Sequence, residues 1–304
     1  MSLLNRPSHG FHSSLVVIYK LLLNKKKLKK ETIQALCAPP TLFKEKDPGH
    51  IRQTLNTWLK LGLFKENPNG EVFIRKDIAK DHPSPDLLPS AARQFVLKEE
   101  NNQNFFESEN SGSADFMRLL AWSLMQDVWE YDQTSHEEVE LHLKKQTKDD
   151  FSIFQQNNTR WSGFKAWALF LGFGWTPRYP KSKFEPDPTV AIRDCLPNVF
   201  ASKKTLDAPT MLQQIAEQIP VLDEGRYRKM VEERLGQSEG EFSWQPPPEG
   251  QLSTSISRSL LRLREDGTLA FADKDDSEHR RSLTGRHRQT IESLTHITWK
   301  GGKA

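Results

Sequence analysis

The chain has 304 residues and a mass of 35.0 kDa, and its 36% hydrophobic and 27% charged residues exclude a wholly disordered protein. Its length predicts two or three domains, because domains cluster near ~100–150 residues. The longest apolar run, residues 15–23, is broken by Lys20, is too short to cross a bilayer and has no secretory cleavage site. Two cysteines cannot build a disulfide framework or a cysteine-based zinc site, so we expect a cytoplasmic protein without membrane contact.

The net charge of +3 conceals a strong asymmetry along the chain. Residues 1–80 hold twelve lysines and three arginines against six acids, a net charge of +9. Residues 81–157 carry −9 and residues 158–304 carry +3. The pattern predicts a polyanionic partner for the first part and a different task for the second. The alternative, that these charges only solvate helix faces, stays open.

The first 80 residues contain three helix signals followed by a hairpin signal. Apolar residues at helical spacing predict a helix over 13–23, and the lysines at 25–30 suit its C-terminal end. A second helix is expected over 30–36 and a third over 49–61, ended by Gly62 in a left-handed conformation. Two short β-like runs, 63–65 and 72–74, flank the turn signal Asn69-Gly70.

This order closely resembles a winged helix-turn-helix domain. The resemblance implies a third helix in the major groove of DNA and a hairpin wing beside the phosphates. Thr57 is expected to face outward with the polar residues around it. The candidate DNA-binding residues here are Lys25, Lys26, Lys27, Arg52, Gln53, Asn56, Lys60 and Arg75. Winged helices also serve as protein-interaction modules, so that alternative remains.

The middle of the chain repeats the pattern in a looser form. Helices are expected over 116–129, 136–146 and 161–171, the last ended by Gly172, and residues 189–192 are expected to form a returning strand. Tryptophan and phenylalanine at helical spacing favour core packing over a base-stacking surface. Because this part is acidic, we expect it to face a partner protein rather than DNA.

The C-terminal part contains a third copy of the pattern. Helices are expected over 211–219, 227–235 and 252–265, with Gly267 ending the last, and strands over 269–271 and 296–299. The outer face of the last helix is expected to hold Ser259 and three candidate DNA contacts, and the long wing after it holds four arginines. The seven candidates here are Ser255, Arg258, Arg262, Arg280, Arg281, Arg286 and Arg288. The alternative is a solvated loop balanced by the acids before it.

The predicted fold class is therefore mainly α with small β-hairpin wings, built from tandem winged helix-turn-helix domains. We expect an N-terminal winged helix over 1–82, a linker over 83–113, a helical, winged-helix-like middle domain over 114–200 and a C-terminal winged-helix-like domain over 201–304.

No catalytic motif emerges from the sequence. There is no glycine-rich phosphate loop, and His136 and His142 are six residues apart, whereas a zinc helix needs them four apart. Pro186-Asp187 could begin a restriction-type nuclease motif, but the residues after it supply neither the acid nor the lysine that such a site needs. We therefore predict a protein that binds and is not an enzyme, with no metal and no cofactor.

The opening residues Ser2-Leu3-Leu4-Asn5-Arg6-Pro7-Ser8-His9-Gly10, leading directly into the first helix and the winged-helix pattern, resemble the DpdG-type proteins. These are accessory proteins of bacterial clusters that insert 7-deazaguanine derivatives into DNA and restrict unmodified DNA. The resemblance implies a role in phage defence beside partner enzymes that supply the chemistry, and it brings no catalytic residues.

The leading functional hypothesis is a DNA-binding adaptor in a bacterial modification–restriction complex, whose partners are double-stranded DNA and other subunits. The alternatives are a protein–protein scaffold without DNA contact and a transcriptional regulator that binds a palindrome as a dimer. A nuclease ranks last, because the sequence lacks the residues for metal-dependent cleavage.

Overall fold

The computed structural model describes residues 3–4, 12–38, 49–103, 105–106, 112–131, 133–146, 157–177, 183–236, 244–274 and 279–301. Most of the opening motif that carries the family resemblance, and part of the predicted linker, lie outside these residues. The chain forms two compact units: the first is Met1–Phe116 with Asn158–Leu171, and the second is Met117–Asn157 with Gly172–Ala304. This division differs from the predicted one, because residues 114–200 are shared between the two units.

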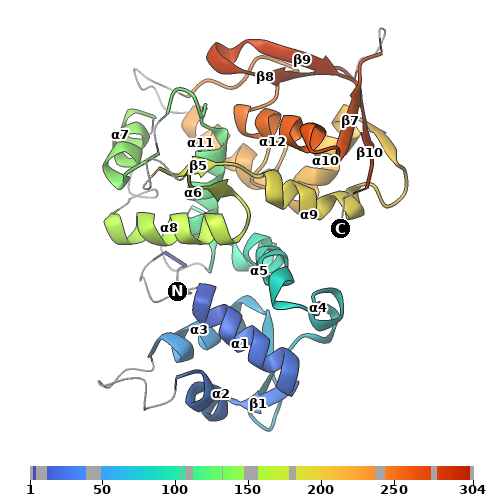
Figure 1. Ribbon diagram of the computed structural model, residues 1–304. Helices are drawn as coiled ribbons and strands as arrows, with labels where there is room; N and C mark the ends of the chain where they lie inside the picture. Colours follow the sequence, from blue (N-terminus) through green and yellow to red (C-terminus); the bar gives the residue numbers. More distant parts are fainter. Residues whose placement is uncertain are drawn as a thin grey trace. The chain divides into compact units, whose positions relative to one another are not determined.

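The first unit begins with the elements that the sequence predicts, plus one strand that it does not (Figure 1). The elements are α1 (His12–Lys25), β1 (Lys27–Lys29), α2 (Lys30–Cys37), α3 (Gly49–Leu61), β2 (Phe64–Glu66) and β3 (Glu71–Ile74). The three strands form an antiparallel sheet in the order β1-β3-β2. The predicted order of three helices, glycine, strand, turn and strand is therefore confirmed, and the lysine-rich segment after α1 is a strand rather than only a helix end.

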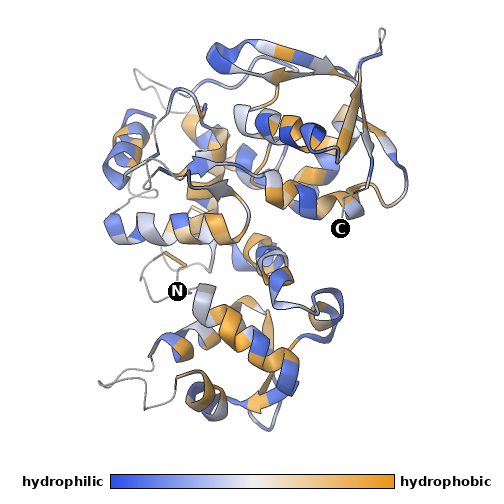
Figure 2. Cartoon of the chain, viewed as in Figure 1, coloured by the Kyte–Doolittle hydropathy of each residue, from blue (hydrophilic) through white to orange (hydrophobic). Residues whose placement is uncertain are grey.

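Further helices complete the first unit. They are α4 (Lys76–Asp81), α5 (Leu88–Leu97) and α8 (Asn158–Phe170). Hydrophobic residues dominate α1, as the orange ribbon in Figure 2 shows, and α1 packs against α3, β3 and α8. The indole of Trp58 on α3 is fully buried, with its ring 5.6 Å from that of Trp167 on α8. Helix α3 therefore has one face in the core, which leaves the opposite face for solvent.

Local sequence signals set the ends of α3 and of the hairpin. Gly62 has φ +95°, and its N–H donates to the carbonyl of Trp58 at 3.1 Å, which ends α3 in the predicted left-handed cap. At the hairpin turn, Gly70 has φ +72°, and Asn67 Oδ1 accepts from the backbone N–H groups of Asn69 and Glu71. The Asn-Gly signal therefore predicts this turn correctly.

The second unit contains the same order of elements with two insertions. Its elements after the middle segment are α9 (Thr189–Val199), β6 (Thr205–Asp207), α10 (Ala208–Gln218), α11 (Arg226–Gly236), α12 (Thr254–Glu265), β7 (Leu269–Ala272), β8 (Arg281–Thr284), β9 (Thr290–Leu294) and β10 (His296–Trp299). The sheet order β6-β10-β7 matches β1-β3-β2 of the first unit. Relative to the first unit, α11 is inserted between the second and third helices, and the β8–β9 hairpin is inserted between the last two strands.

The segment between α5 and α9 forms, besides α8, two helices and a two-stranded sheet. These are α6 (Ala114–Met125), α7 (His136–Gln146), β4 (Gly174–Trp175) and β5 (Glu185–Pro186), and the division between the units falls within α6. The prediction of a returning strand over 189–192 is wrong, because these residues begin α9. The backbone N–H of Thr189 donates to Asp187 Oδ1 at 3.0 Å, a polar contact that favours a helix start over a strand. The returning strand is instead β5.

Candidate nucleic-acid interface

Three of the predicted DNA-contacting residues form a row on α3. Arg52, Asn56 and Lys60 are spaced four residues apart, so they lie along one side of the helix, opposite the buried Trp58. Arg52 and Lys60 are exposed, and Asn56 and the neighbouring Gln53 are partly exposed. Thr57 is 4% exposed, so the prediction that it faces outward is wrong. We call Arg52, Asn56 and Lys60 the α3 row.

The three candidate lysines at the end of α1 are exposed, and one of them also pairs with a carboxylate. Lys25 and Lys26 are exposed at the end of α1, whereas Lys27 Nζ lies 2.8 Å from Glu71 Oε2 on the hairpin. Hydrogen bonds from Lys27 and from the Asn67 amide hold the pKa of Glu71 below its ordinary value. Lys27 therefore joins strand β1 to β3, a structural role that was not predicted from its place in a lysine run.

Arg75, predicted to contact phosphate from the wing, is engaged by a carboxylate two residues away. Its Nε and Nη2 donate to the two oxygens of Asp77 at 3.1 and 2.6 Å, and its guanidinium lies 5.6 Å from the ring of Phe95. The hydrogen bond from Arg75 lowers the pKa of Asp77, and the same bond raises that of Arg75. A phosphate would have to compete with Asp77 for this guanidinium.

Two serines predicted on the outer face of α12 are buried. Ser255 and Ser259 are 1% and 0% exposed, so their predicted position on the surface is wrong. The hydroxyl of Ser255 donates to the carbonyl of Leu124 at 2.6 Å, near the C-terminal end of α6. The hydroxyl of Ser259 donates to the carbonyl of Ser255 at 2.9 Å. The N-terminal half of α12 is therefore packed into the second unit, and its small hydroxyls allow that packing.

The two candidate arginines of α12 have acidic partners. Arg258 Nη2 lies 3.4 Å from Glu185 Oε2, and Arg262 forms an ion pair with Asp187. Asp187 is 7% exposed and belongs to the Pro-Asp pair considered as a nuclease signal. In the structure this carboxylate pairs with Arg262 on α12 and accepts from the N–H of Thr189, so it connects α12 to the start of α9.

The four arginines of the inserted hairpin have different surroundings. Arg280 Nη2 lies 3.3 Å from Asp273 Oδ1, and Arg281 on β8 donates to the carbonyl of Arg280. Arg286 and Arg288 are exposed in the short turn between β8 and β9. The guanidinium of Arg286 lies 5.2 Å from the ring of Trp129, and that of Arg258 lies 5.3 Å from the same ring.

Trp129 is therefore the centre of a cationic cluster, which we define as Trp129, Arg258 and Arg286. The indole is 47% exposed although it is a large apolar side chain. Arginine guanidinium groups stack favourably on tryptophan, and both groups can also bind nucleic acid. The sequence predicts both arginines as DNA contacts, whereas the helical spacing over 116–129 predicts a core position for Trp129. The helix ends at Met125, four residues before it.

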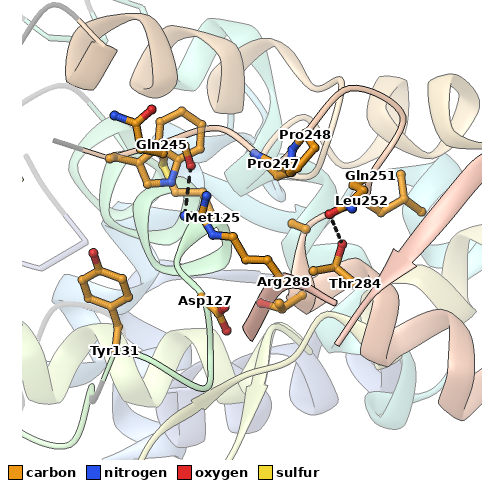
Figure 3. A pocket seen from close by; sticks show the side chains of 13 residues that line it. Met125, Asp127, Tyr131, Gln245, Pro247, Pro248, Gln251, Leu252, Thr284 and Arg288 are labelled. Carbon is orange, nitrogen blue, oxygen red and sulfur yellow. Dashed lines mark hydrogen bonds between the residues drawn. The ribbon is translucent and has the colours of Figure 1, made fainter. Parts of the chain in front are cut away.

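A pocket lies next to this cluster within the second unit (Figure 3). Its lining includes polar, aromatic and cationic side chains: Met125, Asp127, Tyr131, Trp244, Gln245, Pro247, Pro248, Gln251, Leu252, Ser253, Thr254, Thr284 and Arg288. Arg288 Nη2 donates to the carbonyl of Gln245 at 3.4 Å. Of these residues only Arg288 is a candidate from the sequence, since the pocket combines segments that are far apart in the chain.

The described residues lack two kinds of site. Among these residues no group of three or more His, Cys, Asp and Glu side chains could hold a metal ion. Within the same part of the chain, no helix has the length and apolar character needed to cross a membrane.

The described residues define a mainly helical protein with small antiparallel sheets and exposed basic residues in both units. A family model described as DpdG-like matches residues 1–277, and the chain therefore belongs to the DpdG-like family. Membership points to a role in the Dpd DNA modification cluster. No curated protein matches the chain, and no solved structure matches it.

Proposed function

We propose that this protein is a non-enzymatic, DNA-binding adaptor in a bacterial DNA modification–restriction complex that acts in phage defence. The observation that carries the proposal is the α3 row, Arg52, Asn56 and Lys60, on the solvent side of a helix whose other side is in the core. Arginine, lysine and asparagine are the side chains most used to contact phosphates and base edges. A basic N-terminal segment strengthens attraction to DNA.

The element order of the first unit supports a winged helix-turn-helix assignment for residues 12–74. In that assignment α3 enters the major groove, and the β2–β3 hairpin is the wing. The second unit, with the same strand order, is the second winged-helix-like domain. Its third helix is largely covered, so we assign its DNA contact to the arginines of the inserted β8–β9 hairpin.

The salt dependence of duplex binding tests this proposal. The double variant Arg52→Ala/Lys60→Ala removes two positive charges from the α3 row. If both contact phosphates, the slope of log affinity against log salt should flatten by about two. The control Lys20→Ala/Lys80→Ala removes the same charge from exposed positions on α1 and α4 and should leave the slope near that of the wild type. An unchanged slope in the α3 variant would remove this face from the interface.

A protein–protein scaffold is the second candidate, and the carboxylate partners of Arg75 and Arg262 favour it. An arginine that already pairs with a carboxylate of the same chain binds a phosphate less strongly, because its charge is partly neutralised. The scaffold predicts stable co-purification with other products of the cluster but no salt-sensitive duplex binding. The adaptor predicts both, so measuring the two properties on the same preparation separates the candidates.

A further inference from the structure

Two tryptophans of the second unit are exposed, and each has an arginine of α12 beside its ring. Trp129 is 47% exposed, and Trp175 on β4 is 40% exposed. The guanidinium of Arg258 lies 5.3 Å from the ring of Trp129. In the same way, the guanidinium of Arg262 lies 5.7 Å from the ring of Trp175. Single apolar residues scattered over a surface are common, but two exposed indoles with matching arginine contacts indicate a binding surface.

The two tryptophan–arginine pairs lie beside the same face of α12. Arg258 and Arg262 are four residues apart, so their side chains are neighbours on that face. Glu185 links the pairs, because it lies directly opposite Trp175 in the β4–β5 register and its Oε2 is 3.4 Å from Arg258 Nη2. Opposite residues of paired strands have their side chains on one side of the sheet. We call this area the tryptophan–arginine surface, defined by Trp129, Trp175, Arg258, Arg262 and Arg286.

Hydrogen bonds fix the backbone that carries Trp129. Its N–H donates to Asp127 Oδ1 at 2.9 Å within the turn after α6. The N–H of Val128 donates to the hydroxyl of Thr254 at 3.3 Å, which ties this turn to the start of α12. A ligand therefore meets an indole whose backbone is already ordered, and this lowers the entropic cost of binding.

The carboxylates next to this surface are engaged by cations of the same chain. Glu185 Oε1 lies 2.9 Å from Lys183 Nζ, while its other oxygen faces Arg258. Asp187 is 7% exposed and pairs with Arg262. Both carboxylates are therefore largely neutralised before a ligand arrives, and they do little to repel an anion.

The turn of the β8–β9 hairpin adds positive charge that is not neutralised. Arg286 and Arg288 are exposed and have no carboxylate partner in the ranges that the structure describes. The guanidinium of Arg286 lies 5.2 Å from the ring of Trp129. Glu130, next to Trp129 in the sequence, is an exposed acid that opposes this charge. The surface therefore offers flat apolar rings beside guanidinium groups that are open to an anion.

A single strand of nucleic acid matches this arrangement. Its bases have open faces that stack on aromatic side chains, and its phosphates bind arginine. In a duplex the base faces are covered by neighbouring base pairs, so exposed indoles would gain no stacking there. An acidic peptide would satisfy the arginines but would leave the two indoles without flat partners.

We propose that the tryptophan–arginine surface binds a single strand of DNA. One base stacks on Trp129 and another on Trp175, while Arg286 and Arg288 bind phosphates. The choice of DNA rests on the proposed function, whereas the surface itself is separate from the α3 row. The inference narrows the DNA contact of the hairpin arginines to an unpaired strand.

Fluorescence anisotropy of a labelled oligothymidine of about ten nucleotides, titrated with the full chain, tests the stacking. Trp129→Ala should weaken binding about fivefold to a hundredfold, the usual effect of losing one stacked base. Trp129→Phe keeps an aromatic face and should retain most of the affinity. Leu141→Ala is the control, since it truncates an apolar side chain that is 48% exposed on α7, and it should leave the affinity unchanged. Should Trp129→Ala fail to fold, Trp175→Ala on a different element makes the same test.

The salt dependence of oligothymidine binding tests the charges. Arg286→Gln/Arg288→Gln should flatten the slope of log affinity against log salt by about 1.4, because each phosphate contact to a single strand contributes about 0.7. Lys203→Gln/Lys204→Gln removes the same charge from exposed positions between α9 and β6 and should leave the slope unchanged. Glu130→Gln removes the opposing acid and should tighten binding.

Duplex binding separates this inference from the function proposed above. Arg52→Ala/Lys60→Ala should weaken duplex binding and leave oligothymidine binding unchanged, whereas Trp129→Ala should do the reverse. If only the first of these results fails, the α3 row is wrong and the tryptophan–arginine surface stands.

Four results would overturn the inference itself. They are the absence of single-strand binding, an effect of Trp129→Ala no larger than that of Leu141→Ala, and binding of RNA without binding of DNA. The fourth is displacement of the strand by an oligoglutamate of equal charge as efficiently as by unlabelled oligothymidine, which would identify an acidic protein as the partner.

Discussion

Substituting Ser255 tests whether its hydroxyl stabilises the second unit or meets DNA. Ser255→Ala removes the donor that satisfies the carbonyl of Leu124 at 2.6 Å. Leu124 lies in the last turn of α6, where carbonyl groups have no partner within the helix. The net contribution of a hydrogen bond is ~1 kcal/mol, and a buried carbonyl left without a donor costs ~1–3 kcal/mol. We therefore expect a loss of about 2 kcal/mol in the free energy of unfolding.

Urea denaturation monitored by circular dichroism measures this loss, and hydrogen exchange at the start of α12 localises it. The midpoint of thermal unfolding should fall by ~4–8 °C, given ~2–4 °C per kcal/mol for a unit of this size. Ser202→Ala, at an exposed position, is the control and should change little. A loss below about 0.5 kcal/mol, or a flatter salt dependence of DNA binding, would contradict the structural role of the Ser255 hydroxyl.

Two further predictions concern the first unit. Because the pKa of Glu71 is lowered in the folded protein, its contribution to stability is complete above its ordinary pKa of 4.5 and is lost as the pH falls through the lowered value. Glu71→Gln should therefore reduce the thermal midpoint near neutral pH and have a progressively smaller effect as the pH falls below 4.5; an effect that does not change with pH would contradict the pairing with Lys27. Gly62→Ala forces a side chain into a left-handed conformation and should cost ~1–2 kcal/mol in urea unfolding. Gly236→Ala, which has open space around it, should be neutral or stabilising, and an equal loss there would refute the argument.

Local signals in the sequence predicted much of the fold. The helix over 49–61 and its cap at Gly62 follow from apolar spacing and one glycine, both local properties. The strands expected over 269–271 and 296–299 are present as β7 and β10, and they pair with each other. Strand β1 was missed, since Lys27-Leu28-Lys29 is a strand only through its pairing with β3, more than forty residues away.

The candidate sites were harder to predict, because burial depends on tertiary packing. Helical spacing alone could not show that Ser255 and Ser259 on α12 are covered. The hydroxyls fit because they bond to nearby carbonyl groups. The pocket of the second unit was also missed. Its walls come from three separate segments of the chain, which only tertiary packing brings together.

The β8–β9 hairpin has a consequence for how the second unit can evolve. Its turn carries Arg286 and Arg288, but the sheet that closes the unit pairs β7 directly with β10, on either side of the insertion. A change of length or composition in the hairpin turn therefore leaves the register between β7 and β10 intact. The turn of this hairpin can therefore change its side chains without disturbing the domain that supports it.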